Sequence, residues 1–415
     1  MALRLGWFGV VFGMILMLAG CGGDSSSSPL ATPTPTPTPA PGDSFAPAAS
    51  TPTMNQARAS ASAALLNNGK VLIAGGLAAS GPTNSVELYD PASNSFASAA
   101  SLPTMNTARF DATATLLGNG KVLIAGGVGI SGTLDTVELY DSTNNTFASA
   151  SSLPSMNMAR FGATATLLNN GRVLMAGGFV DLYTALGTIE MYDPAASTFA
   201  PAASLPTMGL NLRGAPTATL LSNGNLLIAG GFEGLFGFGI PEVNSSTDLY
   251  QPATNSFAAS SPLMLEDRYM AAATLLPTGN VLIAGGLTAC THFTESTQSV
   301  DLYDATNSTF LPASSLPTMN TSRSSATATL LPNGKVLIAG GSSSSCGPAN
   351  ASPTILASVE LYYPTTNSFS PAALTPTMNN ARSEATATLL PNGKTLIAGG
   401  LGVSGPLDSV ELYSP

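Results

Sequence analysis

The sequence predicts an all-β fold in which one unit of four short strands is repeated seven times. Three observations predict it: evenly spaced Gly-Gly pairs, a turn-forming Asn-Gly before six of the seven pairs (Thr278-Gly279 before the fifth), and a Tyr after every pair, followed by a Phe in the first six repeats. The pairs recur at intervals of 51, 51, 53, 55, 55 and 59 residues, beginning at Gly75, Gly126, Gly177, Gly230, Gly285, Gly340 and Gly399. A fixed period of this length is typical of repeat proteins, in which neighbouring units bury each other's apolar faces.

The composition agrees with short packed strands. Only 9% of the residues are charged and 44% are hydrophobic, and Gly, Ser, Thr, Ala and Asn fill much of the rest. Small residues and turn formers in this proportion favour strands over helices.

The second repeat shows the four expected strands. Residues 110–117 and 121–125 flank Asn119-Gly120, and this dipeptide between two such runs is a strong signal for a two-residue hairpin turn. A third strand covers residues 136–140, and a turn over 141–145 leads to a fourth around Phe147. Four short antiparallel strands in about 50 residues are the signature of a propeller blade.

The Gly-Gly, Tyr and aromatic spacing closely resembles kelch repeats of the type found in the galactose oxidase central domain, and the resemblance covers roughly residues 43–415. It implies a seven-bladed kelch-type β-propeller. The repeated tyrosines match in every repeat, at Tyr89, Tyr140, Tyr192, Tyr250, Tyr303, Tyr362 and Tyr413. Where kelch repeats usually carry Trp, this chain instead has Phe96, Phe147, Phe199, Phe257, Phe310 and Phe369.

The last repeat is expected to be completed by the N-terminal segment. The seventh repeat has no fourth strand after Tyr413, but residues 43–50 match residues 94–101, which form that strand in the first repeat. We therefore expect the N-terminal strand to close the last blade and to remove an exposed sheet edge.

The N-terminal sequence predicts export from the cytoplasm. Residues 1–20 have a charged start at Arg4, an apolar stretch and a small-residue exit, as in a signal peptide. The tetrad Leu18-Ala19-Gly20-Cys21 resembles a bacterial lipobox, which implies cleavage before Cys21 and its lipidation. Residues 21–42, rich in Ser, Thr and Pro, are an expected disordered linker. Gly22 after the cysteine favours the outer membrane, so we expect a lipid-anchored protein of the cell envelope.

The charges are sparse and periodic. The net charge is −10, which argues against nucleic acid as a partner because phosphate binding needs clustered Lys and Arg. Seven arginines and seven acids recur once per repeat, and we interpret them as a ring of structural ion pairs, with Arg268 the first candidate for an exception. The arginines are Arg58, Arg109, Arg160, Arg213, Arg268, Arg323 and Arg382, and the acids are Glu87, Glu138, Glu190, Asp248, Asp301, Glu360 and Glu411.

Length variation identifies a candidate binding face. The segments after Gly-Gly and the links between repeats fall on one face of the propeller, and the longest of these segments are 232–246, 287–299 and 342–358. Binding residues tend to lie on variable loops of a fixed scaffold. The binding candidates are Phe232, Glu233, Phe236, Phe238, Tyr269, His292, Phe293 and Glu295. The alternative is that the phenylalanines only pack their own loops.

Two cysteines remain once Cys21 is assigned to lipidation. Cys290 and Cys346 lie in neighbouring repeats, on the same face, and in a chain expected in an oxidising compartment. We expect them to form a disulfide.

The chemistry-bearing residues exclude several functions. Copper radical oxidases that resemble galactose oxidase need two His, two Tyr and a Cys, and His292 is the only histidine here. The sequence has no His/Cys cluster that would suit zinc. A nucleophile triad needs a histidine as its base, and a single histidine in a long loop is weak evidence for one. We therefore expect no metal and no cofactor. Glu266, Asp267 and Arg268 are weak catalytic candidates for acid–base work on a sugar, as in sialic-acid-epimerising kelch proteins.

The function we favour is a non-enzymatic one. We expect a lipid-anchored binding or scaffold module that presents its variable face to carbohydrate or protein partners, as a monomer that meets the membrane only through its lipid. A cofactor-independent sugar epimerase or mutarotase of the kelch type is the alternative. The sequence does not identify the ligand.

Overall fold

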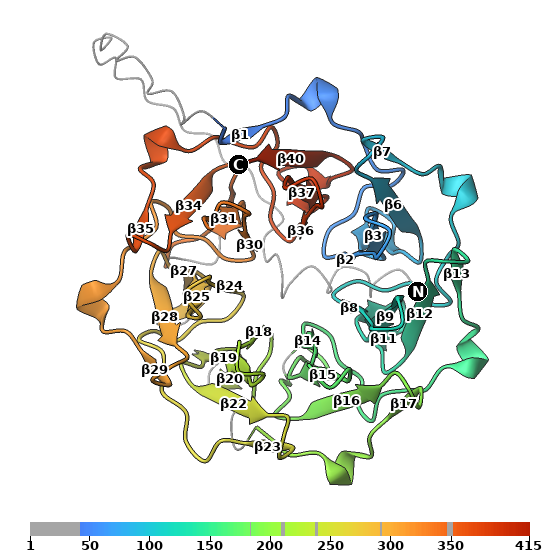
Figure 1. The fold of residues 1–415 in the computed structure, drawn as a ribbon, viewed down its shortest axis with the longest axis horizontal. Helices are drawn as coiled ribbons and strands as arrows, with labels where there is room; N and C mark the ends of the chain where they lie inside the picture. Colours follow the sequence, from blue (N-terminus) through green and yellow to red (C-terminus); the bar gives the residue numbers. More distant parts are fainter. Residues whose placement is uncertain (1–41, 183, 209–211, 237–239, 291–292, 347–351) are drawn as a thin grey trace.

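Seven four-stranded antiparallel sheets surround a central axis (Figure 1). The structure is a computed structural model, and it describes residues 42–415 apart from 183, 209–211, 237–239, 291–292 and 347–351. The predicted signal peptide, Cys21 and most of the predicted linker lie outside the described residues. Within the described part, no helix is long and apolar enough to cross a bilayer.

Each blade has its first strand at the axis and its fourth at the rim. Blade 1 contains β2 (Ser62–Leu65), β3 (Val71–Ala74), β6 (Val86–Asp90) and β7 (Ser95–Phe96), and blade 2 contains β8 (Thr113–Leu116), β9 (Lys121–Ala125), β12 (Val137–Asp141) and β13 (Thr146–Phe147). Blade 3 contains β14 (Thr164–Leu167), β15 (Val173–Ala176), β16 (Ile189–Asp193) and β17 (Thr198–Phe199), and blade 4 contains β18 (Thr217–Leu220), β19 (Leu226–Ala229), β22 (Thr247–Gln251) and β23 (Ser256–Phe257).

The remaining three blades follow the same order. Blade 5 contains β24 (Ala272–Leu275), β25 (Val281–Ala284), β28 (Val300–Asp304) and β29 (Thr309–Phe310). Blade 6 contains β30 (Thr327–Leu330), β31 (Val336–Ala339), β34 (Val359–Tyr363) and β35 (Ser368–Phe369). Blade 7 contains β36 (Thr386–Leu389), β37 (Thr395–Ala398), β40 (Val410–Ser414) and, at the rim, the N-terminal strand β1 (Ser44–Phe45). The seven-bladed all-β architecture predicted from the sequence is confirmed.

The segments after Gly-Gly form small hairpins of their own in six blades of the described chain. They are β4–β5 (Leu77–Ala78, Gly81–Pro82), β10–β11 (Val128–Gly129, Gly132–Thr133), β20–β21 (Phe232–Phe236, Ile240–Val243), β26–β27 (Leu287–Cys290, Phe293–Ser296), β32–β33 (Ser342–Ser343, Thr354–Ile355) and β38–β39 (Leu401–Gly402, Gly405–Pro406). Short 3-10 turns follow the outer strands at η1 (Ala48–Ser50), η2 (Ala99–Ser101), η3 (Ala150–Ser152), η4 (Ala202–Ser204), η5 (Ala313–Ser315) and η6 (Ala372–Leu374).

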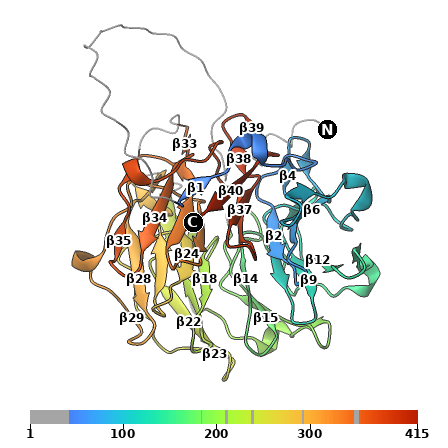
Figure 2. The ribbon, with the colours of Figure 1, turned by 45° about the horizontal axis from the view of Figure 1, so that its top comes forward.

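The N-terminal strand closes the ring as predicted. β1 pairs antiparallel with β40, with Phe45 opposite Tyr413, and Figure 2 shows the two strands side by side. The Tyr413 hydroxyl donates to the Asp43 carboxylate at 2.7 Å, and Lys335 of blade 6 pairs with the same carboxylate at 2.8 Å. The closing segment is therefore bound to two blades.

The hydrophobic core lies between blades. One cluster joins Leu72 and Ala74 of blade 1 to Val122, Ile124 and Tyr140 of blade 2, and equivalent clusters recur around the ring. Within each blade the repeated Tyr contacts the repeated Phe of the outer strand, with ring centroids 5.2–5.5 Å apart. The Phe that replaces the usual Trp is thus the partner of the buried Tyr.

The Gly-Gly pairs are required at the contact between blades. Gly126 has φ +66°, and a Cβ there would collide with the carbonyl oxygen of Arg160 in the next blade. The amide of Gly127 donates to that same carbonyl at 2.9 Å. Only glycine allows this backbone approach without strain, which explains why the pair recurs with the blade period.

Candidate functional site

The seven periodic arginines and acids form buried ion pairs, as predicted. The Arg and acid atoms lie 2.7–3.2 Å apart, and every one of the seven arginine side chains is fully buried. In blade 2, Glu138 accepts from Arg109 at 3.0 Å, from the Asn106 amide at 3.0 Å and from the Thr107 amide at 2.9 Å. Arg109 also donates to the Gly126 carbonyl at 2.8 Å. Each pair therefore binds the link from the preceding blade, which carries the arginine, to the third strand of the next blade, which carries the acid.

Arg268 follows the same pattern and is not an exception. It donates to Asp301 at 2.7 Å and to the Gly285 carbonyl at 2.6 Å, and it is 1% exposed. Glu266 lies farther from it, at 3.9 Å. Its two terminal nitrogens donate inside the blade, and its Nε is buried without a hydrogen-bond partner, so the guanidinium offers no accessible donor to a ligand.

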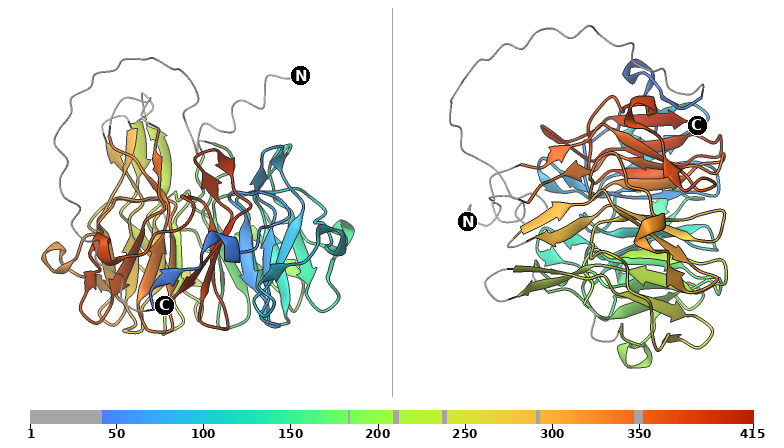
Figure 3. Two further views of the ribbon diagram at one scale, coloured as in Figure 1. Left: turned by 90° about the horizontal axis from the view of Figure 1, so that it is seen from above. Right: turned by 90° about the vertical axis from the view of Figure 1, so that its left-hand side faces the viewer.

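The propeller has two different faces. The links between blades and the hairpins after strand two lie on one, which we call the link-and-hairpin face; the left panel of Figure 3 shows the hairpins standing on this side of the disc. The Asn-Gly turns and the turns between strands three and four lie on the other, the turn face. The turn face is nearly identical in every blade, so distinctive chemistry has to lie on the link-and-hairpin face or in the central channel.

A row of aromatic rings crosses the link-and-hairpin face from blade 3 to blade 5. Phe161, Phe179, Phe232 and Tyr269 follow one another with centroid distances of 5.3, 6.0 and 5.3 Å. All four belong to or pack against one buried cluster, and burial raises the pKa of the Tyr269 hydroxyl. The structure thus buries the binding candidate Phe232 in this cluster, while Tyr269 packs against it and is partly buried.

A polar pocket of about 420 Å³ lies beside β26–β27. Its lining includes Glu266 from the incoming link and Glu295 from the hairpin, together with Thr288, Gln298 and Ser322. The structure therefore brings together two acids that are 29 residues apart in the sequence. Carboxylates and hydroxyls in one pocket can bind hydroxyl or amine groups by hydrogen bonds.

A disulfide fixes one wall of this pocket. Cys290 and Cys346 are bonded across blades 5 and 6, with Cα atoms 6.1 Å apart, which confirms the predicted pair. The Cys346 amide also donates to Glu295 at 3.1 Å. The pocket acid is thereby held to the neighbouring blade.

The other candidates are dispersed over the same face. The amide of Asn244 binds Glu233, and burial raises the pKa of that carboxyl. Asp267 accepts from Thr288 at 2.8 Å, and Phe293 is exposed on β27. Phe238 and His292 lie outside the described residues, and for Phe236 only the backbone of β20 is described.

Exposed apolar side chains gather on the link-and-hairpin face. Among the described residues, the large exposed apolar side chains in its links and hairpins are Ile130, Met158, Leu212, Leu263, Leu265, Phe293 and Val403, whereas Leu374 lies in η6 at the rim. Ile130 and Val403 occupy hairpin tips and are 82% and 85% exposed. These exposed side chains are spread over the links and hairpins of blades 2 to 5 and blade 7, so most of the exposed large apolar side chains that a partner could contact lie on this face.

The formal net charge of the protein is carried by the link-and-hairpin face and the central channel. On the turn face the five remaining lysines and arginines, Lys70, Lys121, Arg172, Lys335 and Lys394, are balanced by five acids, Asp43, Asp90, Asp141, Asp193 and Asp304. The seven buried pairs cancel, as do Arg4 and Asp24 in the N-terminal region. The charge of −10 is therefore carried by two channel acids and by eight acids of the link-and-hairpin face, which are Asp135, Asp181, Glu233, Glu242, Glu266, Asp267, Glu295 and Asp408.

A ring of equivalent residues lines the central channel. Each lies two positions after a repeated arginine, has φ between 47° and 57°, and donates its amide to the carbonyl of its counterpart in the preceding blade at 2.9–3.2 Å; they are Ser60, Asp111, Gly162, Ala215, Met270, Ser325 and Glu384. This closed circle of hydrogen bonds joins all seven blades at the axis. The side chains of this ring differ in nearly every blade, although the arginine two positions earlier is the same in all seven.

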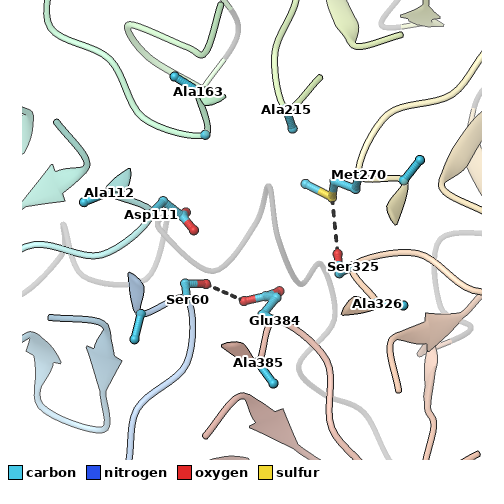
Figure 4. Close-up of a pocket in the computed structure, with 13 residues that line it drawn as sticks. Ser60, Asp111, Ala112, Ala163, Ala215, Met270, Ser325, Ala326, Glu384 and Ala385 are labelled. Atoms are coloured by element: carbon cyan, nitrogen blue, oxygen red, sulfur yellow. Dashed lines mark hydrogen bonds between the residues drawn. The ribbon is translucent and has the colours of Figure 1, made fainter. Parts of the chain in front are cut away.

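Two of these channel residues are acids without a basic partner. Figure 4 shows Asp111 and Glu384 pointing into a cavity of about 300 Å³, with Ser60 donating to Glu384 at 2.7 Å. Enclosure by the channel wall, and then the charge of Glu384, raise the pKa of Asp111 to about 7. Desolvation also raises the pKa of Glu384. The pair resembles other neighbouring carboxyl groups that hold a proton near neutral pH, because ionising both would place two negative charges close together in a poorly solvated space.

Asp111 should make stability depend on pH. Because its pKa is raised on folding, its contribution is present below about pH 4 and is lost as the pH rises through about 7. Relative to the wild type, Asp111→Asn should therefore gain stability between pH 4.5 and 7.5, by on the order of 2–4 kcal/mol. Urea unfolding of both proteins across that range measures the difference. A difference that does not change with pH would contradict the assignment.

Sequence reasoning missed this channel ring. The available signal was the position two residues after each periodic arginine, which reads Ser, Asp, Gly, Ala, Met, Ser and Glu. The position directly after each arginine varies as well, but it pairs with the segment after Gly-Gly, so variation alone did not distinguish the channel ring from a packed position.

Comparisons with known proteins agree with the fold. A family model described as the Kelch motif matches residues 58–103, which span the incoming link and the four strands of blade 1. No match was found among curated proteins. The match covers one of the seven blades, so the chain contains a Kelch motif within a seven-bladed all-β propeller.

Solved structures show the same architecture. A fungal alcohol oxidase of the AA5 family in complex with copper is 19% identical, with a TM-score of 0.68, over 89% of this chain and 76% of the oxidase. YjhT is 13% identical, with a TM-score of 0.54, over 77% of this chain and 99% of YjhT. At this level of identity the likeness shows the fold alone.

The donor set of this chain does not fit a copper centre. Within the described residues, no group of three or more His, Cys, Asp and Glu side chains is placed to hold a metal ion. The sequence has one histidine, and Cys290 and Cys346 are joined in the disulfide.

Proposed function

We propose that the protein is a binding or scaffold module of the cell envelope that engages carbohydrate or protein partners through its link-and-hairpin face. The observation that carries the proposal is the difference between the two faces. One face repeats the same short turns, while the other holds the hairpins, the polar pocket, the exposed apolar side chains and the surplus charge.

The rigid base of this face suits recognition. The aromatic row from blade 3 to blade 5 and the Cys290–Cys346 disulfide hold the hairpins in fixed positions. Preorganised groups lose less conformational entropy on binding. A pocket lined by Glu266, Glu295 and hydroxyl side chains would then supply the polar contacts.

A screen of residues 43–415 against a glycan array, together with crosslinking in the native envelope, tests the proposal. Binding to a glycan or a protein should fall at least tenfold in the Glu266→Gln/Glu295→Gln double variant. The matched control is Asp90→Asn/Asp304→Asn, which makes the same charge change on the turn face. Binding that falls only in the control would contradict the assignment of the face.

The proposed location rests on the lipobox-like tetrad. Lipidation of Cys21 would anchor the body to the outer membrane, and the Ser/Thr-Pro segment would hold it away from the surface. Cys21→Ala should move the protein from the membrane fraction to the soluble fraction. Unchanged partitioning would refute the anchor.

A cofactor-free sugar epimerase or mutarotase is the second candidate, because two carboxylates share the polar pocket. Glu266 and Glu295 could then act as acid and base, whereas Arg268 is occupied by its buried pair. Mass spectrometry and NMR of every sugar that binds would reveal conversion. Turnover that is lost in Glu266→Gln would favour the enzyme, and saturable binding without turnover would favour the module.

A further inference from the structure

The electrostatic asymmetry of the propeller indicates the chemistry of its partner. All described lysines and arginines outside the buried pairs lie on the turn face, while the link-and-hairpin face and the channel carry only acids. Acidic groups spread over blades 2 to 5 and blade 7 would attract a positive partner and repel a negative one.

The channel at the centre of this face has two chemically different sides. Glu384, Ser60 and Asp111 follow one another on blades 7, 1 and 2, while Ala215 and Met270 lie on blades 4 and 5 (Figure 4). One carboxylate oxygen of Asp111 is buried and has no hydrogen-bond partner. No lysine or arginine lines the cavity. An ammonium or guanidinium group on an aliphatic stem would satisfy the acids and place its stem against the apolar side.

The hairpin tips supply an independent apolar contribution. Ile130 and Val403, on blades 2 and 7, flank the blade that carries Ser60, and both are almost fully exposed. Aliphatic tips on an acidic face are complementary to a segment that alternates basic and apolar residues. A small cation could fill the channel, but it could not also reach the hairpin tips and the outlying acids.

We infer that the link-and-hairpin face docks a positively charged, partly apolar segment of a partner protein, with one lysine or arginine side chain entering the channel beside Asp111 and Glu384. The inference rests on the proposed function and deepens it by naming the partner's chemistry. It also predicts which carboxylates matter, since the channel acids would be desolvated by the bound side chain and the rim acids would mainly steer association.

Fluorescence anisotropy with three labelled peptides tests the inference. One peptide alternates Lys and Leu, and two counterparts of the same length carry Gln or Glu in place of Lys. We expect the lysine peptide alone to bind, with an affinity that falls between 20 mM and 300 mM salt. Asp111→Asn/Glu384→Gln should weaken binding at least tenfold at 150 mM salt, and Asp90→Asn/Asp304→Asn, which likewise replaces two carboxyl groups by amides but on the turn face, less than twofold.

Equal binding of the glutamine peptide, or wild-type affinity in the channel variant, would overturn the inference. Circular dichroism and thermal melts of each variant separate loss of binding from loss of fold. Calcium binding to the peptide-free protein that disappears in the channel variant would also overturn it, by showing that the acids hold a metal ion. A glycan or protein that binds this face regardless of charge would refute the inference alone, whereas ligands that bind only the turn face would refute the proposed function as well.

Discussion

Glu138→Ala is expected to destabilise the protein by about 3–5 kcal/mol, because it leaves a buried arginine without its counter-ion. Arg109 and Glu138 are almost completely buried, and their nearest atoms are 3.0 Å apart. The change also removes the acceptor of the Asn106 and Thr107 amides, so the link into blade 2 loses its attachment. Chemical denaturation followed by circular dichroism measures the loss.

The exposed pair of the same blade is the control. Lys121 and Asp141 are 3.9 Å apart and partly exposed, so Lys121→Ala should change stability by less than about 1 kcal/mol. Similar small losses in both variants would mean that the buried ring of ion pairs does not hold the links. Each blade has a buried ion pair equivalent to Arg109–Glu138, so alanine substitution of Glu190 or Glu411 should destabilise the protein in the same way.

Deleting residues 43–50 is expected to open the ring and to cause a loss of at least 3–5 kcal/mol, comparable to removing a buried Phe. The deletion removes β1, which leaves the edge of β40 unpaired, exposes Tyr413, and takes the Asp43 carboxylate from Lys335. An open edge with an exposed aromatic side chain also favours association between chains. Thermal melts and size-exclusion chromatography would detect both effects.

Two comparisons distinguish the effect of closing the ring from the effects of shortening the chain or removing one side chain. Removing residues 22–41 shortens the chain more than the deletion does, but it leaves β1 in place and should not change the melting temperature. Phe45→Ala and Phe96→Ala remove the same ring from equivalent positions, and Phe45→Ala should be the more damaging because it also loosens the closure. A deletion variant that melts like the wild type would contradict the closing role of β1.

Much of the scaffold could be predicted because the repeat fixes it locally. Asn119-Gly120 specifies its hairpin turn, Gly126-Gly127 meets the next blade's backbone, and residues 43–50 carry the missing strand's own pattern. The disulfide followed from cysteine count and from the order of the blades. These features depend on short-range chemistry repeated many times, so a single sequence contains enough examples of each.

The candidate site was less predictable because periodicity does not tell which side chains face a space. Phe232 and Tyr269 were binding candidates from their place in variable segments, and the structure shows Phe232 buried in the aromatic row and Tyr269 partly buried against it. Arg268 looked distinctive because acids precede it, but its own blade uses its guanidinium. Asp111 and Glu384 are far apart in the chain, and only closure of the ring brings them to one cavity.

Hydrogen–deuterium exchange with a bound partner tests the central claim, that the link-and-hairpin face is the functional face. The account predicts slowed exchange in the hairpins β20–β21 and β26–β27 and in the links that enter the blades, with unchanged exchange at turns such as Asn119-Gly120. Protection confined to the Asn-Gly turns, with unprotected hairpins, would contradict it.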